Sequence, residues 1–231
     1  MNFADAHIHL TEKGCCYPDL NRAELLFSCT AKPDEWKTQM SINDSRIVHF
    51  YGVHPWYAEQ WNDDAEKELR DLLSKDPDAQ VGEIGLDNLH PFDHQIEVFE
   101  TQVSMASEFR RTVNVHNIGC DGEVAKILRT CGKGCRGIIL HSFNKASISS
   151  FSGLDCYFSV NPRLLGKSEK NAKTVLSCIP EDRLLLETDA PFTSGKFTSM
   201  GDFISSISGM LGLSPETLSE TVLENARRAI Q

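Results

Sequence analysis

The sequence has little positive charge and no long hydrophobic run. Its 231 residues include 23 lysines and arginines against 33 aspartates and glutamates, which gives a net charge of −10. This balance excludes a protein that coats duplex DNA with positive charge, although bound metal ions could supply positive charge locally. No stretch approaches the 18 apolar residues of a membrane-spanning helix, so we expect no membrane partner.

The chain also lacks repeats, low-complexity tracts and linkers, so we expect one domain over residues 1–231. Hydrophobic residues make up 40% and charged residues 24%, which excludes global disorder. The first ten residues show no basic segment followed by an apolar one, so they do not resemble a secretory signal. Eight cysteines occur without paired CxxC spacing, and we expect reduced thiols and a cytoplasmic location.

Eight apolar, β-rich segments recur along the chain. Several are almost continuously apolar, as expected for parallel strands that are buried on both faces. The predicted strands are Phe3–Ile8, Glu24–Thr30, Ile47–Val53, Gln80–Leu86, Thr112–His116, Gly137–His141, Cys156–Val160 and Arg183–Thr188.

Amphipathic helical patterns separate most of these strands. They are clearest at Asp64–Leu73, Phe92–Phe109, Gly122–Leu128 and Glu169–Ile179, with Asp121 or Ser168 as candidate caps of the last two. Eight strands alternating with helices predict a TIM-type (β/α)8 barrel of the α/β class. Thr11–Ala23 contains Gly14 and Pro18, so we expect a degenerate first helix. An open doubly wound sheet is the alternative.

Two histidines stand at the end of the first predicted strand. Side chains alternate along a strand, so His7 and His9 point to the same side and could both reach one metal ion. Two histidines in a polar loop are the alternative for such a motif alone. Active sites of (β/α)8 barrels lie at the carboxyl ends of the strands, where this pair is expected.

Other predicted strands also end in imidazole or carboxylate groups. Such polar groups, if buried at one rim, need partners. Four imidazoles and two carboxylates suit two divalent ions, which could be Mg²⁺, Mn²⁺ or Zn²⁺. The candidate metal ligands are His7, His9, Glu83, His116, His141 and Asp189.

The chemistry of paired metals suggests roles for both carboxylates. Glu83 is the candidate bridge between two ions, which would lower the pKa of a shared water. Asp189 is the candidate general base that takes the proton of this water. Glu187 and Asp5 share the inward direction but lie deeper, so we expect them to orient the ligands; a buried carboxylate bonded to backbone is the alternative for each.

The sequence closely resembles the TatD family of metal-dependent deoxyribonucleases, within the amidohydrolase-like barrels. The resemblance implies a TIM-type barrel, the same six metal ligands, and hydrolysis of phosphodiesters, typically by a 3′-to-5′ exonuclease acting on DNA. It rests on short motifs in a shared order: Asp5–His9, Gly52–Pro55, Gly82–Asp87, Val115–His116, His141–Phe143, Glu187–Pro191 and Asn225–Arg228.

One departure concerns phosphate binding. Isoleucine occupies position 118, two residues after His116, where family members usually carry arginine. Arg163 and Lys167 follow the seventh predicted strand, and loops there often hold phosphate in these barrels. Arg163 could clamp a phosphate through two hydrogen bonds and Lys167 could add charge, but an ordinary solvated basic loop is the alternative.

The segment after the third predicted strand offers further substrate contacts. His54 is expected at the rim, where it could hydrogen-bond a substrate oxygen. Trp56 or Tyr57 could stack a base, or pack under the loop. The expected partner is therefore a DNA end or another phosphodiester, bound by a monomer rather than an obligate oligomer.

Two other functions fit the same residues. The metals could serve hydrolysis of an amide, a lactone or an aminoacyl-tRNA ester, because barrels of this kind support many reactions. The chain could also be a non-catalytic, metal-stabilised interaction module. The complete set of six ligands favours a hydrolase.

Overall fold

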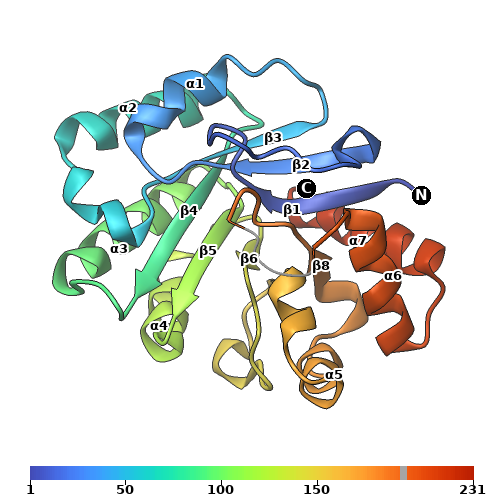
Figure 1. Ribbon diagram of the computed structural model, residues 1–231. Helices are drawn as coiled ribbons and strands as arrows, with labels where there is room; N and C mark the ends of the chain where they lie inside the picture. The colour runs from blue at the N-terminus through green and yellow to red at the C-terminus, as the bar shows by residue number, and fades with distance from the viewer. Residues whose placement is uncertain (193–196) are drawn as a thin grey trace.

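The computed structural model describes residues 1–192 and 197–231. Eight parallel strands run in the order β1 to β8, each beside its neighbour in the sequence (Figure 1). All eight predicted strands are present, and the predicted barrel is confirmed. The strands are β1 (Phe3–Ile8), β2 (Ala23–Cys29), β3 (Ile47–Tyr51), β4 (Gln80–Asp87), β5 (Val113–Ile118), β6 (Ile138–Leu140), β7 (Cys156–Val160) and β8 (Leu184–Leu186).

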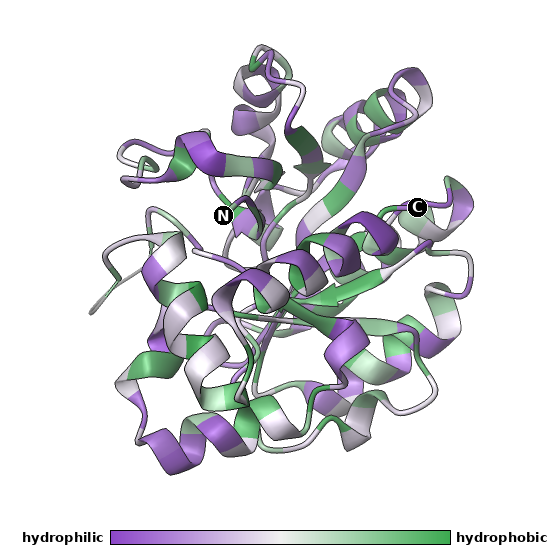
Figure 2. Cartoon of the chain, turned by 90° about the vertical axis from the view of Figure 1, so that its right-hand side faces the viewer, coloured by the Kyte–Doolittle hydropathy of each residue, from purple (hydrophilic) through white to green (hydrophobic). Residues whose placement is uncertain are grey.

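Helices surround the strands. The four predicted helices correspond to α2–α5, with ends shifted by at most three residues. The helices are α1 (Trp36–Met40), α2 (Asp63–Lys75), α3 (Asp93–Glu108), α4 (Asp121–Cys131), α5 (Glu169–Ser177), α6 (Met200–Leu211) and α7 (Pro215–Ala229). Figure 2 shows hydrophilic residues in purple alternating with hydrophobic residues in green along them, as expected for helices with one buried side.

Local sequence explains where these helices begin. The Asn62 side chain accepts from the N–H groups of Asp64 and Ala65 at 3.0 Å and so caps α2. Ser168 caps α5 as expected, accepting from Asn171 N at 3.3 Å. The expectation for Asp121 is wrong, because its carboxylate binds the side chains of Asn117 and Lys145 instead of a helix N–H.

The first connection is degenerate, as predicted. Between β1 and β2 the chain forms only the short 3₁₀ turn η1 (Leu20–Arg22). Asp19 instead contacts α6, where its carboxylate accepts from the N–H groups of Met200 and Gly201 at 2.9 and 2.8 Å. The loop after β1 is therefore attached to the start of α6.

The barrel closes between its first and last strands. An isolated parallel bridge joins Ile8 to Ala190, and Asp189 N donates to His7 O at 2.9 Å. Asp5 reinforces this contact, because its carboxylate accepts from the N–H and hydroxyl of Thr188 at 2.9 and 2.6 Å. Closure thus fixes the ends of β1 and β8 relative to each other.

The cysteines and the helix lengths bear on the expectations of reduced thiols and of no membrane partner. All eight cysteines are free thiols. Among the described residues, no helix is long and apolar enough to cross a membrane.

Candidate metal centre

The Glu83 carboxylate lies at the centre of five imidazoles. Its Oε1 is 2.7 Å from His141 Nε2, 2.9 Å from His116 Nδ1 and 3.3 Å from His54 Nε2. Its Oε2 is 3.4 Å from His7 Nε2 and 3.5 Å from His9 Nε2. Each carboxylate oxygen thus faces its own group of ring nitrogens, as expected for a carboxylate that bridges two ions.

The arrangement of donors fits divalent metals. The Nε2 atoms of His7 and His9 approach each other to 3.0 Å, and His9 Nε2 is 3.7 Å from Asp189 Oδ1. Ligand atoms of His7, His9 and Asp189 lie within 4.8 Å of one another, as do those of His54, Glu83 and His116. Buried nitrogen and carboxylate groups that converge in this way suit ions such as Zn²⁺ or Mn²⁺.

Asn114 fixes the direction of one imidazole. Its Nδ2 donates to Ala6 O at 3.0 Å, so its Oδ1 is the atom that lies 2.9 Å from His7 Nδ1. His7 therefore carries its proton on Nδ1 in this contact and presents Nε2 to the centre. Sequence reasoning missed Asn114, although its place two residues before His116 on β5 was a signal that both point inward.

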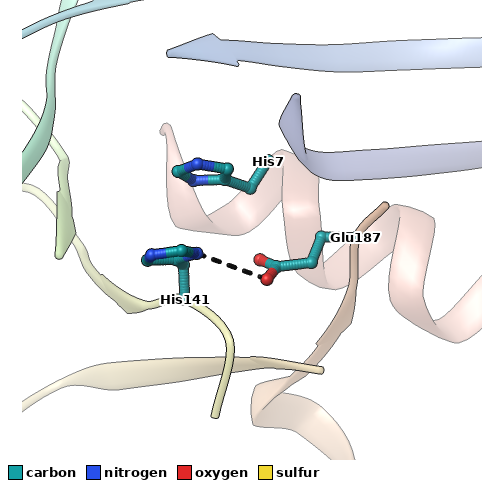
Figure 3. A group of neighbouring side chains, drawn as sticks. All are labelled: His7, His141 and Glu187. Carbon is teal, nitrogen blue, oxygen red and sulfur yellow. Dashed lines mark ion pairs between the residues drawn. The ribbon is translucent and has the colours of Figure 1, made fainter. Parts of the chain in front are cut away.

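Glu187 supports a second imidazole. Its Oε1 lies 3.4 Å from His141 Nδ1, and the His141 ring stacks on His7 with centroids 4.0 Å apart (Figure 3). The same oxygen accepts from Ser142 N at 2.8 Å. The geometry agrees with the expectation that Glu187 orients a ligand.

Asp5 has a different role from the expected one. It contacts the backbone N–H of His7, but its other partners are Thr188 and the Tyr17 hydroxyl, at 3.1 Å from its Oδ2. Burial raises the pKa of Asp5 to about 7, although the bonds from Thr188 lower it. Asp5 thus closes the barrel between β1 and β8, whereas sequence parity alone suggested an orienting contact to an imidazole ring.

The charges of the cluster are strongly coupled. Burial by itself raises the pKa of Glu83, but the facing rings of His54, His141 and His7 hold it well below its usual value. Burial lowers the pKa of His141, whereas Glu83 and Glu187 outweigh this effect and bring it to about 9. Burial lowers the pKa of His54, although Glu83 raises it in part. The metal-free cluster is therefore an anionic carboxylate surrounded by partly protonated imidazoles.

Asp189 connects the cluster to Arg163. Its Oδ2 lies 2.8 Å from Arg163 Nη1, while Oδ1 faces His9. Asp189 has a φ of 57° and Ser142 a φ of 50°, conformations that non-glycine residues seldom adopt and that often occur at functional sites. Burial raises the pKa of Asp189, which increases the basicity of its carboxylate.

His54 lies deeper than expected. The sequence suggested a residue at the rim, but His54 is buried against Glu83. The reason is the 3₁₀ helix η3 (Pro55–Gln60), whose first free N–H, on Trp56, donates to His54 Nδ1 at 3.1 Å. This bond leaves the proton on Nε2, so His54 is a hydrogen-bond donor toward the centre.

A cavity of about 510 Å³ opens above the cluster. Arg163 lines it, but Lys167, which follows the 3₁₀ helix η5 (Pro162–Gly166), is exposed and does not. Among the described lining residues, Arg163 is the only lysine or arginine. The lining comprises His9, Glu12, Ala31, His54, Trp56, Tyr57, Glu83, Asp87, Leu89, His116, Asn117, Ile118, His141, Ser142, Arg163, Asp189 and Phe192.

The family model of TatD related DNase matches residues 4–231. This chain belongs to the TatD family. The protein named uncharacterized metal-dependent hydrolase YabD of Bacillus subtilis is 32% identical over 146 residues, which are 61% of this chain and 57% of YabD. The 3′-5′ ssDNA/RNA exonuclease TatD of Pantoea vagans is 31% identical over 147 residues, covering 61% of this chain and 56% of that protein.

Solved TatD structures share the fold over its full extent. The TatD homologue YJJV of Escherichia coli has a TM-score of 0.86 at 19% identity, covering 99% of this chain and 97% of that one. A TatD family hydrolase of Entamoeba histolytica has a TM-score of 0.82 at 18% identity, covering 100% and 98%. The sequence alignments with the two relatives named above span 57% and 56% of their length.

Proposed function

We propose that this TatD hydrolase is a two-metal 3′-to-5′ exonuclease for DNA ends. The proposal rests on the Glu83 carboxylate, whose two oxygens face two different groups of imidazoles. His7, His9 and Asp189 would hold one ion and His116 and His141 the other, with Glu83 between them. Such ions would supply a water of lowered pKa and stabilise charge on the phosphate oxygens.

Residues of the chain would carry out the proton transfer of the reaction. Asp189, made more basic by burial, takes the proton of the attacking water. The water oxygen bonds to phosphorus, the P–O3′ bond breaks, and the terminal nucleotide leaves with its 5′-phosphate. The 3′ oxygen of the shortened strand takes a proton from solvent.

Two further side chains would bind the phosphate. The Nε2–H of His54 points into the cluster and can donate to a phosphate oxygen. Arg163 is half exposed, lines the same cavity and pairs with Asp189, so it can also donate to a phosphate there. Lys167 lies outside the cavity, so its contact with a phosphate further along a longer strand remains a prediction. The name of the Pantoea vagans relative as a 3′-5′ ssDNA/RNA exonuclease supports this substrate class.

Hydrolysis of a less anionic ester or amide is the second candidate. Arg163 is the one lysine or arginine among the described lining residues, and it is paired with Asp189. Ile118, where an arginine was expected, lines the cavity as well. A substrate with little charge would fit such a lining.

The test is hydrolysis of a 5′-labelled single-stranded oligonucleotide with Mg²⁺ or Mn²⁺. We compare wild type with Asp189→Asn and with Asp78→Asn, an exposed aspartate before the start of β4 that serves as control. The proposal expects stepwise shortening from the 3′ end by wild type and the control, and none by Asp189→Asn. A folded, metal-loaded wild type that leaves DNA intact but cleaves an ester or amide would contradict it in favour of the second candidate.

A further inference from the structure

The mouth of the cavity is unusually apolar. Four large hydrophobic side chains are exposed among the described residues: Met40 (49%), Trp56 (54%), Leu89 (78%) and Phe192 (52%). Three of the four, all but Met40, line this cavity. Exposed apolar groups that gather around one opening indicate a binding surface rather than scattered surface residues.

One carboxylate holds two of these groups in place. Asp87 is buried, and its Oδ2 accepts from the Trp56 indole Nε1 at 2.7 Å, while its Oδ1 accepts from Leu89 N at 2.9 Å. Gln95 fixes Asp87 in turn, donating to its carbonyl oxygen at 3.1 Å and accepting from its N–H at 2.8 Å. The indole is therefore held in place, with the rings of His54 and His90 each 4.9 Å from it between centroids, and it remains half exposed.

The same carboxylate also contacts the candidate metal centre. Asp87 Oδ2 lies 3.3 Å from His116 Nε2, and His116 Nδ1 faces Glu83. Trp56, Asp87 and His116 thus form a continuous polar connection from the cavity mouth to Glu83. A group stacked on Trp56 would be held at a fixed place relative to the cluster.

Phe192 stands near the other side of the cluster. Its ring meets the His9 ring edge-on at 5.1 Å between centroids, and its carbonyl oxygen accepts from Arg163 Nη2 at 3.0 Å. The mouth therefore presents aromatic or aliphatic surface next to His116 and next to His9. Trp56, Leu89 and Phe192 thus offer apolar surface to a substrate, beside the polar residues of the cluster that would contact its phosphate.

We infer that the mouth is a subsite for an unpaired nucleobase, the base of the nucleotide at the scissile phosphodiester. The inference rests on the proposed nuclease function and narrows it. Trp56 is the stacking surface, Leu89 and Phe192 flank it, and Asp87 is a positioning residue that acts through Trp56 and His116. Nucleobases have flat faces that stack on aromatic side chains without regard to sequence, and a base inside a duplex has no free face to offer. The subsite thus favours an end whose terminal base is unpaired and can turn onto Trp56.

Turnover of a strand that lacks one base tests the subsite. Wild type, Trp56→Ala and Met40→Ala receive a single strand with a normal 3′-terminal nucleotide and one with an abasic terminal nucleotide. Stacking on an aromatic side chain implies that wild type and Met40→Ala lose roughly 5- to 100-fold in kcat/KM on the abasic strand. Trp56→Ala should show the lowered kcat/KM on both strands, because it lacks the stacking surface. Equal rates of wild type on both strands would overturn the inference while leaving the nuclease function intact.

A binding measurement covers the case in which no strand is cleaved. An oligonucleotide with 2-aminopurine as its 3′-terminal base loses fluorescence when this base stacks on an indole. We expect quenching by wild type and Met40→Ala, weaker quenching by Trp56→Phe, and none by Trp56→Ala. Quenching without cleavage would support the subsite and reject the nuclease, whereas equal quenching by all four proteins, or none by wild type, would overturn the subsite.

Discussion

At the scale of single residues, the site depends on one carboxylate among imidazoles. Glu83 is nearly fully buried and has five ring nitrogens within 3.5 Å. Replacing it by glutamine removes the negative charge that all five rings face. Asn114 and Glu187 act one step further out, since each fixes the direction of one ring.

We predict that Glu83→Gln abolishes hydrolysis and weakens metal binding at least about 100-fold. In metal-free protein it should also lower the pKa of His141 from about 9, because Glu83 contributes to that elevation. Activity, metal titration and imidazole NMR measure these effects. Glu68→Gln, on the exposed side of α2, is the control. Retained hydrolysis in Glu83→Gln would contradict its central role.

Asn114→Ala should weaken metal binding by about 10- to 100-fold, the usual effect of losing a residue that orients a ligand. The alanine no longer accepts from His7 Nδ1, so the ring loses its fixed proton and direction. Metal titration monitors the change, with the exposed Asn171→Ala on α5 as control. Unchanged affinity would show that packing alone orients His7.

Metal affinity should rise with pH and level off above about 9. His141 has a pKa raised to about 9 in the absence of metal, so below this pH a proton occupies a ring that must be neutral to bind an ion. Binding then releases protons, and their number falls as the pH approaches the raised pKa. Calorimetric titrations in two buffers of different ionisation enthalpy count the protons. Affinity that is flat between pH 6 and 9 would contradict this account.

At the scale of elements, the strands must pass close together for their ends to meet. Gly85 on β4 shows this most clearly, since a Cβ there would lie 1.9 Å from His116 O on β5, at a φ of 149°. No side chain fits this position without moving the strand that carries His116. Gly85 thus allows β4 and β5 to lie close enough together for His116 to reach the site.

Gly85→Ala should destabilise the fold by about 2–4 kcal/mol, through the clash and the unfavourable φ. Gly122→Ala is the matched control, because a Cβ there meets nothing within 4 Å and the residue lies in α4, where alanine is favoured by up to about 1 kcal/mol. Denaturant unfolding of both variants checks the difference. Equal stability of the two would show that β4 adjusts freely.

At the scale of the whole molecule, charge limits how nucleic acid can bind. The net charge is −10, and Arg163 is the one described lysine or arginine in the cavity. Each neutralised phosphate contributes a slope of about −0.7 to log K against log salt for single strands. We predict a slope of about −1 or shallower, and weaker binding of duplex than of single strand of equal length. A slope near −4 would indicate a basic groove elsewhere.

The fold was largely predictable because buried parallel strands are continuous apolar segments, and all eight were located from this feature. Helices α6 and α7 were not predicted, although Ser199 and Ser214 cap them by accepting from Asp202 N and Thr217 N. The histidines and carboxylates at strand ends could be found by alternation. The burial of His54, the support from Asn114 and the link through Asp87 depend on which strands are neighbours, and no local pattern contains that information.

In the proposed two-metal site, Glu83 bridges two divalent ions. Electron paramagnetic resonance of protein loaded with Mn²⁺ tests it directly, because two manganese ions that share a carboxylate are magnetically coupled, whereas a single ion gives an isolated six-line spectrum. We predict two Mn²⁺ per chain with the spectrum of a coupled pair, and loss of the coupling in Glu83→Gln. One Mn²⁺ per chain, or two that remain uncoupled in the wild type, would contradict it.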